Sequence, residues 1–424
     1  MTGGPDHAAA ASEARRTGGA FLAFGHRDFA AYWVGSLFGN LGFQMQSAAL
    51  FWQVYDLTGS TLDLAFIGLA EFAPALLLLA VTGPTADRVE RRLIVQCGYA
   101  VQFVGALLLV AFTLAKPSEA WPFFIVAFLF GSVRAFSSPA GRAMVAILVP
   151  TEHLSNAVAW RSIGFQMAII GGPALAGLIY QVGPVTVYAT VAGIMLVGVV
   201  ALQLVGRRPP ASAGERPGWG SLIAGLRFVW SQPVLLGAIS LDLFAVLFGG
   251  AVALLPVYAK DILQVGTAEY GLLRSAAAIG GASMALTLAL VPLRRRVGRT
   301  LFIAVAIFGI GTIVFGLSRN YYLSLAALIA LGAADMISVY VRSNIVPLAT
   351  PDTMLGRITA VEMVFIGASN ELGAFESGAV AWLIGPVLTV VLGGVATLAV
   401  CGLWIKLFPP LYGVDRLDQR LSGH

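Results

Sequence analysis

The chain has 424 residues, of which 58% are hydrophobic and only 11% are Asp, Glu, Lys or Arg, and its formal net charge is +5. Its mean hydropathy of +0.85 leaves too little polar surface for a water-soluble globule, so we expect an integral membrane protein. The apolar runs are continuous rather than alternating, which favours spanning helices over a β-barrel. Basic residues lie in short loops instead of one patch, so nucleic acid is not an expected partner.

The predicted elements begin after an Ala- and Gly-rich segment. No apolar stretch of the signal-peptide kind precedes Phe29, so residues 1–28 are predicted to be a disordered cytoplasmic tail. At roughly 35 residues for each span and its loop, the chain has room for about twelve spans. The predicted spans are 29–55, 61–82, 93–115, 121–148, 157–181, 185–206, 234–258, 267–291, 300–317, 321–349, 358–383 and 386–408.

These spans form two predicted six-helix bundles, at residues 29–206 and 234–408. Residues 207–233 are predicted to be a cytoplasmic linker that contains an interfacial helix, and residues 409–424 a cytoplasmic tail. Arginine-rich loops fall on the side of the two termini, whereas the opposite loops hold Lys116, Lys260 and Arg319. By the positive-inside rule, both termini are expected in the cytoplasm, as in a multi-pass protein of the bacterial inner membrane.

The two halves also repeat weakly. An offset of 201 residues aligns Gly131 with Gly332, Arg134 with Asp335, Pro150 with Pro351 and Leu154 with Leu355. Parallel repeats of this kind place a substrate site between the two halves near the bilayer midplane in many transporters. Chance similarity between apolar helices is the alternative interpretation.

The loop after the second predicted span carries a motif. It reads Gly83-Pro-Thr-Ala-Asp87-Arg88-Val-Glu-Arg91-Arg92 and resembles the Gly-x-x-x-Asp-Arg-x-x-Arg-Arg loop of the major facilitator superfamily of twelve-span carriers. A charge cluster that exists in only one conformation would bias the equilibrium between inward-open and outward-open states. A purely topogenic arginine cluster is the alternative. The predicted gating residues are Gly83, Asp87, Arg88, Arg91, Arg92, Arg142 and Arg357.

The fifth predicted span contains Ile170-Gly-Gly172-Pro173-Ala-Leu-Ala-Gly177. It resembles the Gly-Pro-x-x-Gly-Gly element of drug exporters in this superfamily, although the closing glycine pair is incomplete. Glycines allow close helix approach, and a proline frees one carbonyl. Ordinary small-residue packing competes with an export-specific role. The predicted helix-packing residues are Gly171, Gly172, Pro173 and Gly177.

Four further segments narrow the resemblance: 139–150, 242–256, 369–378 and 407–411. They are similar to segments of the transmembrane secretion effector family. This resemblance implies export of siderophores and related small molecules, driven by protons, and spans 1, 4, 7 and 10 around a central cavity.

Charged residues inside the spans are the candidate site. A charge at mid-membrane costs a few kcal/mol, so it usually faces a partner or a wet cavity. Burial favours the protonated form of a carboxyl group, which lets an acid load and release a proton as its surroundings alternate. The predicted residues for proton coupling or substrate binding are Asp242, Glu371, Asp335, Arg134, Glu376, Glu71 and Arg274.

The most specific geometric hypothesis is an Arg134–Asp335 bridge across the repeat axis. Glu362 and Glu376 are predicted to share one face of span 11, which meets span 2 at Glu71, while Glu371 points elsewhere. For each acid, a structural ion pair or a hydrogen-bonded carboxyl is the alternative. Arg134 is a candidate for binding an anionic substrate such as a catecholate.

The sequence therefore predicts a secondary active transporter, a proton-coupled exporter that moves siderophore-like or drug-like small molecules across the inner membrane by alternating access. An importer of a small nutrient and a non-transporting scaffold or sensor are the alternatives. No nucleotide-binding Gly-x-x-x-x-Gly-Lys-Ser/Thr motif occurs, and no catalytic constellation or metal-ligand spacing is present. We expect no enzyme activity, cofactor or metal, and a monomer in the lipid bilayer.

Overall fold

The computed structural model describes residues 19–78, 82, 85, 88–207, 219–351 and 353–416. Within these residues the secondary structure is helical throughout, without strands. Twelve of the helices lie where the sequence predicts spans. They are α2 Arg27–Thr58, α3 Thr61–Leu77, α5 Arg91–Ala115, α6 Trp121–Leu148, α7 Leu154–Tyr180, α8 Pro184–Gln203, α10 Pro233–Phe248, α12 Thr267–Leu290, α13 Val297–Leu317, α14 Tyr321–Leu348, α15 Leu355–Ile384 and α16 Pro386–Leu407.

Short helices connect or extend these spans. They are η1 Leu22–Gly25, η2 Thr151–His153, α9 Trp219–Ser231, η3 Ala251–Leu254, α11 Leu255–Val257, η4 Tyr258–Ile262 and α17 Pro409–Tyr412. The helix α9 packs on α15 and α10 with Val229 buried, and leaves Trp230 exposed.

Nine helical stretches of the described residues are long and apolar enough to cross a membrane, which makes the chain an all-α polytopic membrane protein. The helices α2, α3 and α15 are not among the nine. The described part of α3 is 17 residues long. The other two are rich in polar residues, such as Gln46 in α2 and the glutamates of α15.

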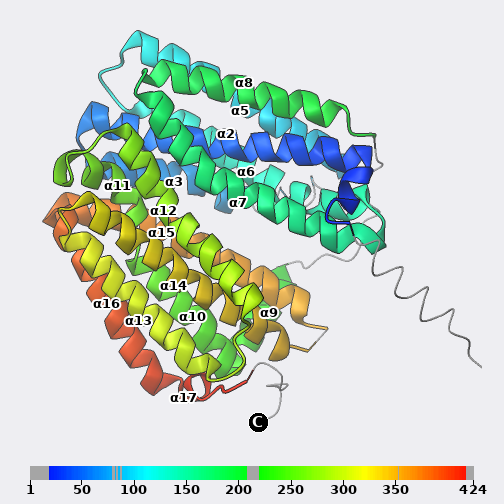
Figure 1. The fold of residues 1–424 in the computed structure, drawn as a ribbon, viewed down its shortest axis with the longest axis vertical. Coiled ribbons are helices and arrows are strands. Elements are labelled where there is room, and N and C mark those ends of the chain that lie inside the picture. The colour runs from blue at the N-terminus through cyan, green and yellow to red at the C-terminus, as the bar shows by residue number, and fades with distance from the viewer. Residues whose placement is uncertain are drawn as a thin grey trace, which may run out of the picture.

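The helices form two bundles with the same internal arrangement (Figure 1). Within the first bundle α2 packs on α7 and α8, and α6 packs on α3 and α5; within the second, α10 packs on α15 and α16, and α14 packs on α12 and α13. Gly131 and Gly332, which the 201-residue offset aligns, are used alike. A Cβ at Gly131 would collide with the Glu71 carbonyl of α3, and one at Gly332 with the Ala277 carbonyl of α12.

The hydrophobic cores are distributed unevenly along the bundles. One core cluster contains residues of both bundles, including Leu50 and Tyr258. It lies at the end away from Arg207 and Trp219, and the end that holds these two residues is called the linker end. The clusters around Phe29 and around Leu301 each draw on one bundle only. The two bundles are therefore joined by a common core at one end and have separate cores at the linker end.

The predicted continuous span 234–258 is interrupted. The helix α10 ends at Phe248, and Gly249 and Gly250 precede the short η3, α11 and η4 segments. A Cβ on Gly250 would collide with the Gly373 carbonyl and the Ser377 hydroxyl of α15. The break therefore lets α15 approach the backbone where two glycines leave room.

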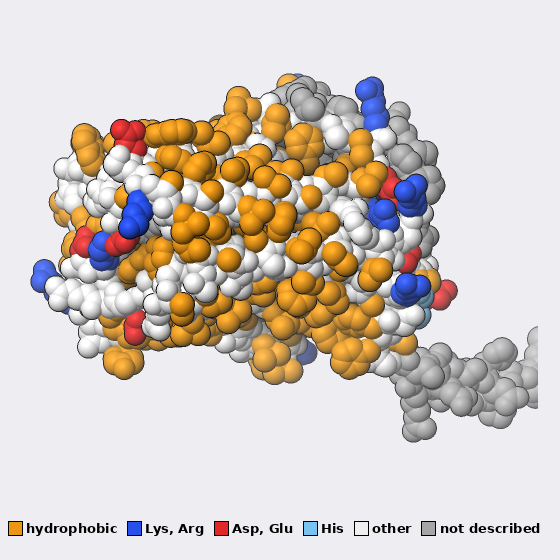
Figure 2. Space-filling view, turned by 90° about the horizontal axis from the view of Figure 1, so that it is seen from above, with side chains coloured by type: hydrophobic (Ala, Val, Ile, Leu, Met, Phe, Trp, Pro, Cys, Tyr) orange, Lys and Arg blue, Asp and Glu red, His pale blue; other side chains and the backbone are white. Residues whose placement is uncertain are grey.

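The outer surface matches a membrane protein. Figure 2 shows hydrophobic side chains in a broad band across the viewed face, with Lys, Arg, Asp and Glu gathered toward the two ends of the molecule. Lipid tails require such a band, because they cannot hydrogen-bond with exposed polar groups.

Candidate transport site

An ion pair crosses between the bundles at mid-depth. Arg134 of α6 donates from Nη2 to Glu371 Oε1 of α15 at 3.1 Å. The Arg134 side chain is 51% exposed, whereas that of Glu371 is 16% exposed. The guanidinium carbon of Arg134 also lies 5.9 Å from the ring centre of Phe43 on α2. Arg134 is thus a positive charge beside an aromatic ring that an incoming molecule can reach.

Glu71 of α3 lies beside this pair but is buried. Its Oε1 has no hydrogen-bond partner among the described residues, and the carboxyl interacts electrostatically with Glu371, Arg134 and Arg274. The position follows from packing, because Gly131 allows α6 to approach the Glu71 backbone. Glu71 therefore places a second carboxyl group at the interface, beside the Arg134–Glu371 pair.

Arg274 of α12 completes the charges at this interface. It donates to the Ser47 hydroxyl of α2 at 3.0 Å and to the Tyr270 hydroxyl at 3.1 Å, and its guanidinium carbon lies 4.9 Å from the ring centre of Phe51. At this depth each bundle therefore contributes an arginine that contacts the other bundle: Arg134 contacts α15, and Arg274 contacts α2.

A second charged cluster lies inside the C-terminal bundle. Arg342 of α14 forms an ion pair with Asp242 of α10 and donates from Nε to Glu362 Oε1 of α15 at 2.8 Å. Ser338 donates to Asp242 Oδ1 at 3.3 Å. The three ionised side chains are buried, with exposed fractions between 5% and 13%.

Asp335 lies next to this second cluster. It lines a small cavity of about 10 Å³ together with Asp242, Ser338 and Phe308. The predicted Arg134–Asp335 bridge is therefore wrong. Asp335 has a short side chain that lies within its own bundle, whereas the longer Arg134 side chain reaches across the interface to Glu371.

The glutamates of α15 face different helices from those predicted. The helix α15 does pack on α3, with Gly378 against Ala65. However, Glu371 rather than the Glu362 face lies near Glu71, and Glu362 turns into the C-terminal bundle. Glu376 is partly buried and interacts with the Ser377 hydroxyl.

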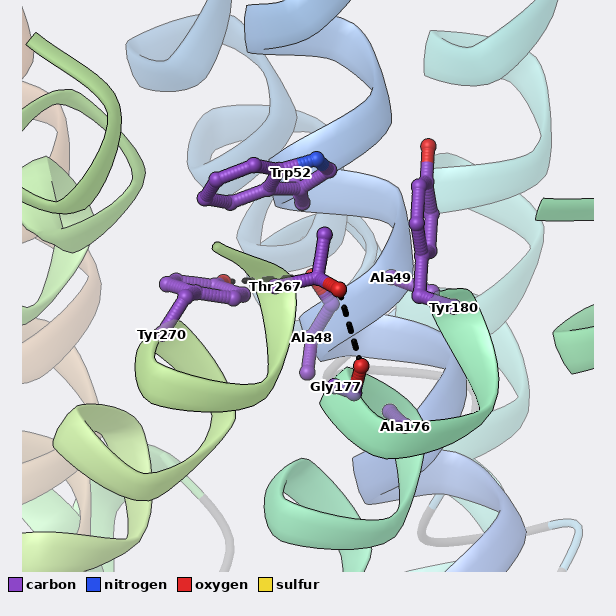
Figure 3. Close-up of a pocket in the computed structure, with 8 residues that line it drawn as sticks. All are labelled: Ala48, Ala49, Trp52, Ala176, Gly177, Tyr180, Thr267 and Tyr270. Carbon is purple, nitrogen blue, oxygen red and sulfur yellow. Dashed lines mark hydrogen bonds between the residues drawn. The ribbon is translucent and has the colours of Figure 1, made fainter. Parts of the chain in front are cut away.

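The bundles close against each other at the end away from the linker (Figure 3). Thr267 donates to the Gly177 carbonyl at 2.9 Å, and the rings of Trp52 and Tyr270 lie 5.0 Å apart between centres. Farther out, Lys260 pairs with Asp56 at 2.5 Å. Access to Arg134 from this end is therefore obstructed.

The predicted helix-packing residues lie at two helix contacts. A Cβ on Gly172 would meet Gln44 and the Leu41 backbone of α2, and Gly171 lies near Leu41. Gly177 and the Pro173 carbonyl lie against Gly271 of α12. The segment therefore packs α7 within its own bundle on one side and against the other bundle on the opposite side.

The predicted gating loop is only partly visible, because Gly83 and Asp87 lie outside the described residues. Arg91 donates to the Ala143 carbonyl at 3.5 Å, and Arg92 donates to the Gln203 carbonyl at 3.4 Å and to the Val205 carbonyl. Carbonyls at a helix C-terminus lack helical partners, so Arg92 caps α8.

The remaining gating candidates are arginines near the linker end. Arg88 is exposed. Arg142 contacts the Met363 sulfur of α15 at 3.4 Å, and Arg357 contacts the Met354 sulfur at 3.6 Å. Arg142 thus reaches the other bundle, whereas Arg357 contacts its own.

Sequence reasoning missed Arg342, which organises the second cluster. The signal was available, because Arg342 lies inside the predicted span 321–349 and meets the same criterion of charge at depth as the acids. Ser47 and Ser338 carried no such signal, because hydroxyls are common in spanning helices.

Comparisons with known proteins identify the family of this chain. The family model described as transmembrane secretion effector matches residues 18–424. The chain belongs to the transmembrane secretion effector family. Enterobactin exporter EntS of Shigella dysenteriae serotype 1 is 25% identical over 324 residues, covering 76% of this chain and 77% of the relative. The same protein of Escherichia coli O1:K1 shows the same identity and coverage.

Solved structures establish the fold. A bacterial homologue of the lysosomal transporter Spinster is 14% identical with a TM-score of 0.69, over 91% of this chain and 98% of that one. A bacterial homologue of ferroportin is 16% identical with a TM-score of 0.67, over 92% and 99%. Both are transporters of the same fold. The match to the family model and the curated exporters make this member of the transmembrane secretion effector family a transporter of the major facilitator type rather than an enzyme.

Proposed function

We propose that this protein is a proton-coupled exporter of anionic, siderophore-like small molecules, which works by alternating access in the bacterial inner membrane. The observation that carries the proposal is the reachable Arg134 between the two bundles, paired with Glu371 and lying beside Phe43. A catecholate offers both a negative charge and an aromatic ring to this site. The curated relatives, which are named as enterobactin exporters, support the same substrate class.

Alternating access follows from how the bundles meet. The bundle-crossing contacts Lys260–Asp56 and Thr267–Gly177 hold the end away from the linker. With both termini in the cytoplasm, as the loop charges predict, this arrangement is an inward-facing form. An anion that displaces Glu371 from Arg134 removes one bundle-crossing pair, and so changes the balance between the two forms.

Proton coupling is supported by the charges at the same interface. Glu71 and Glu371 face Arg134 and Arg274 at mid-depth. An arriving anion adds a negative charge, and a proton on one of the two acids offsets a negative charge. The protonation state of these acids and the binding of an anion at Arg134 therefore depend on each other, which is the link that coupled transport requires.

The test is uptake of enterobactin into inside-out membrane vesicles with and without a proton gradient. We expect gradient-dependent uptake by the wild type, and at least a tenfold loss with Arg134→Gln or Glu371→Gln. The matched controls are Arg319→Gln and Glu152→Gln, which change the same residue types at exposed positions. Uptake that survives collapse of the gradient would rule out antiport while leaving the carrier assignment.

A different result separates the alternatives. Accumulation only in right-side-out vesicles would identify an importer. Unchanged enterobactin handling in every variant, together with no transport by the wild type, would favour a scaffold. If Arg134→Gln or Glu371→Gln abolished the uptake of uncharged hydrophobic drugs but not that of enterobactin, the anionic substrate class would be wrong.

A further inference from the structure

The helix α15 carries an ion pair on each of two opposite faces. Glu362 and Glu371 are nine residues apart, which at 100° per residue places them about 180° apart around the helix and roughly 13 Å apart along it. Glu362 binds Arg342 of the C-terminal bundle, while Glu371 binds Arg134 of the N-terminal bundle. One helix is thus attracted to each bundle by a separate pair.

The pair inside the C-terminal bundle has an excess of acids. Asp242, Asp335 and Glu362 share one guanidinium, that of Arg342, and all four interact electrostatically. Asp335, Ser338 and Arg342 lie at positions i, i+3 and i+7 of α14, so they share one face of that helix. Asp335 forms no ion pair with any residue that the structure describes, and it stands two turns from Arg342.

This arrangement provides a spare partner for Arg342. If Glu362 takes up a proton, its charge disappears, but Arg342 still faces Asp242 and Asp335 and is not left as an unpaired buried charge. The charged group that contacts Glu362 is Arg342 of α14, whose guanidinium also interacts with Asp242 of α10 and Asp335 of α14. From the N-terminal bundle, Arg142 of α6 contacts the neighbouring Met363. Only Glu362 of these acids lies on α15.

We propose that Glu362 is a proton-binding site that controls substrate access to Arg134 through α15. When Glu362 is ionised, its attraction to Arg342 holds α15 on the C-terminal bundle and opposes the Glu371–Arg134 pair. When Glu362 is protonated, only the attraction between Arg134 and Glu371 remains. The Arg134 guanidinium is then occupied by Glu371 instead of an anionic substrate. The step is addition of one proton from water to the carboxylate, with no other bond made or broken.

The inference rests on the proposed function and deepens it, because it places the coupling proton away from the substrate. Coupling between two sites is reciprocal, so substrate binding must release the proton. Affinity for an anion should therefore rise with pH, by up to about tenfold per pH unit while one proton is released for each anion bound.

The experiment measures enterobactin affinity of the purified full-length protein from mildly acidic to mildly basic pH. We expect the wild type to bind more tightly as pH rises. Glu362→Gln should bind weakly and without that pH dependence, because it mimics the protonated form, and Glu362→Asp should restore the dependence. Asp335→Asn removes a neighbouring negative charge, so the pH midpoint should move to a lower value while binding remains.

One control variant and three further outcomes separate this inference from the proposed function. The double variant Glu362→Gln/Arg342→Gln removes both charges of the pair, and so tests the same site without leaving an unpaired buried charge. Wild-type pH dependence that persists in Glu362→Gln, while Arg134→Gln abolishes binding, would overturn this inference and leave the proposed function standing. No enterobactin binding by the folded wild type would defeat the proposed function itself. Dependence on sodium concentration in place of pH would overturn the proton assignment.

Discussion

At the scale of single residues, the feature that decides most is charge kept inside the membrane. Arg342 is 4% exposed and serves two carboxylates on two other helices. Arginine suits this position because its planar group offers several fixed donors and keeps its charge when buried. The same residue type at Arg134 is half exposed and has one carboxylate partner. Burial therefore separates a structural arginine from one that is available to a ligand.

We predict that Arg342→Gln destabilises the protein strongly. The substitution leaves Asp242 and Glu362 without their shared cation, and breaking a buried pair in this way costs about 3–5 kcal/mol. Thermal unfolding in detergent should show a lower Tm for Arg342→Gln and partial recovery when Glu362→Gln is added. Arg319→Gln, at an exposed position, should leave the Tm unchanged. Equal Tm values for Arg342→Gln and the wild type would contradict the buried network.

The sequence could identify which charges lie at depth, but it could not pair them. Helix periodicity places Glu362 and Glu371 on opposite faces of one helix. It does not say which bundle each face meets, because that depends on how six helices pack. The pairing of Arg134 with Asp335 failed for this reason. Arg134 reaches another bundle, and Asp335 remains in its own.

At the scale of elements, glycines set the distances between helices. Gly332 of α14 sits against the Ala277 backbone of α12, so a side chain there has no flexible neighbour that can yield. Gly193 of α8 is exposed, and a Cβ added to it would have no neighbouring atom within 4 Å. The two helical glycines differ only in what surrounds them.

This contrast predicts that replacing glycine with alanine changes stability in opposite directions at the two positions. Gly332→Ala should destabilise by about 1–3 kcal/mol, because overpacking forces the helices apart. Gly193→Ala should be neutral or stabilise by up to about 1 kcal/mol, because alanine favours the helix. Differences in Tm between the two variants and the wild type provide the measurement. A stabilised Gly332→Ala would show that α12 and α14 are not in close contact.

Helix positions were predictable from hydropathy because apolar runs of sufficient length are unambiguous. The break at Gly249 and Gly250 was not, because glycine is also common within spanning helices. The long helices α2 and α15, which are not among the nine apolar stretches, are also those that bring Phe43 and Glu371 to the interface. Low hydropathy within a predicted span is thus itself a pointer to the site.

At the scale of the whole molecule, two bundles share one core at one end and have separate cores at the other. Opening the joined end requires the loss of Lys260–Asp56, Tyr55–Asp261 and Thr267–Gly177. The side chains of Lys260 and Asp56 are 40% and 53% exposed. An exposed ion pair contributes at most about 1 kcal/mol to stability, so this end is held closed by many weak interactions.

We predict that Lys260→Ala shifts the population toward the form that is open at this end by at most about fivefold. The measurement is labelling of a cysteine introduced at Ala48, which lines the pocket of Figure 3, in a background without Cys97 and Cys401. A membrane-impermeant thiol reagent should react faster after Lys260→Ala. Arg319→Ala is the control. Slower labelling would mean that Lys260 does not hold the closed end.

The interruption after Phe248 has a mechanical consequence. The helix α10, which carries Asp242, ends before Gly249 and Gly250. It is therefore not continuous with η3, which contacts α3. A continuous helix would transmit any tilt of η3, α11 and η4 to Asp242. Because the span is divided at two glycines, the segments η3, α11 and η4 can change orientation while α10 and its Asp242 keep their position. A side chain at Gly249 would collide with Phe308, and one at Gly250 with α15, so substitution there should alter both this joint and the packing of the charged half of the span.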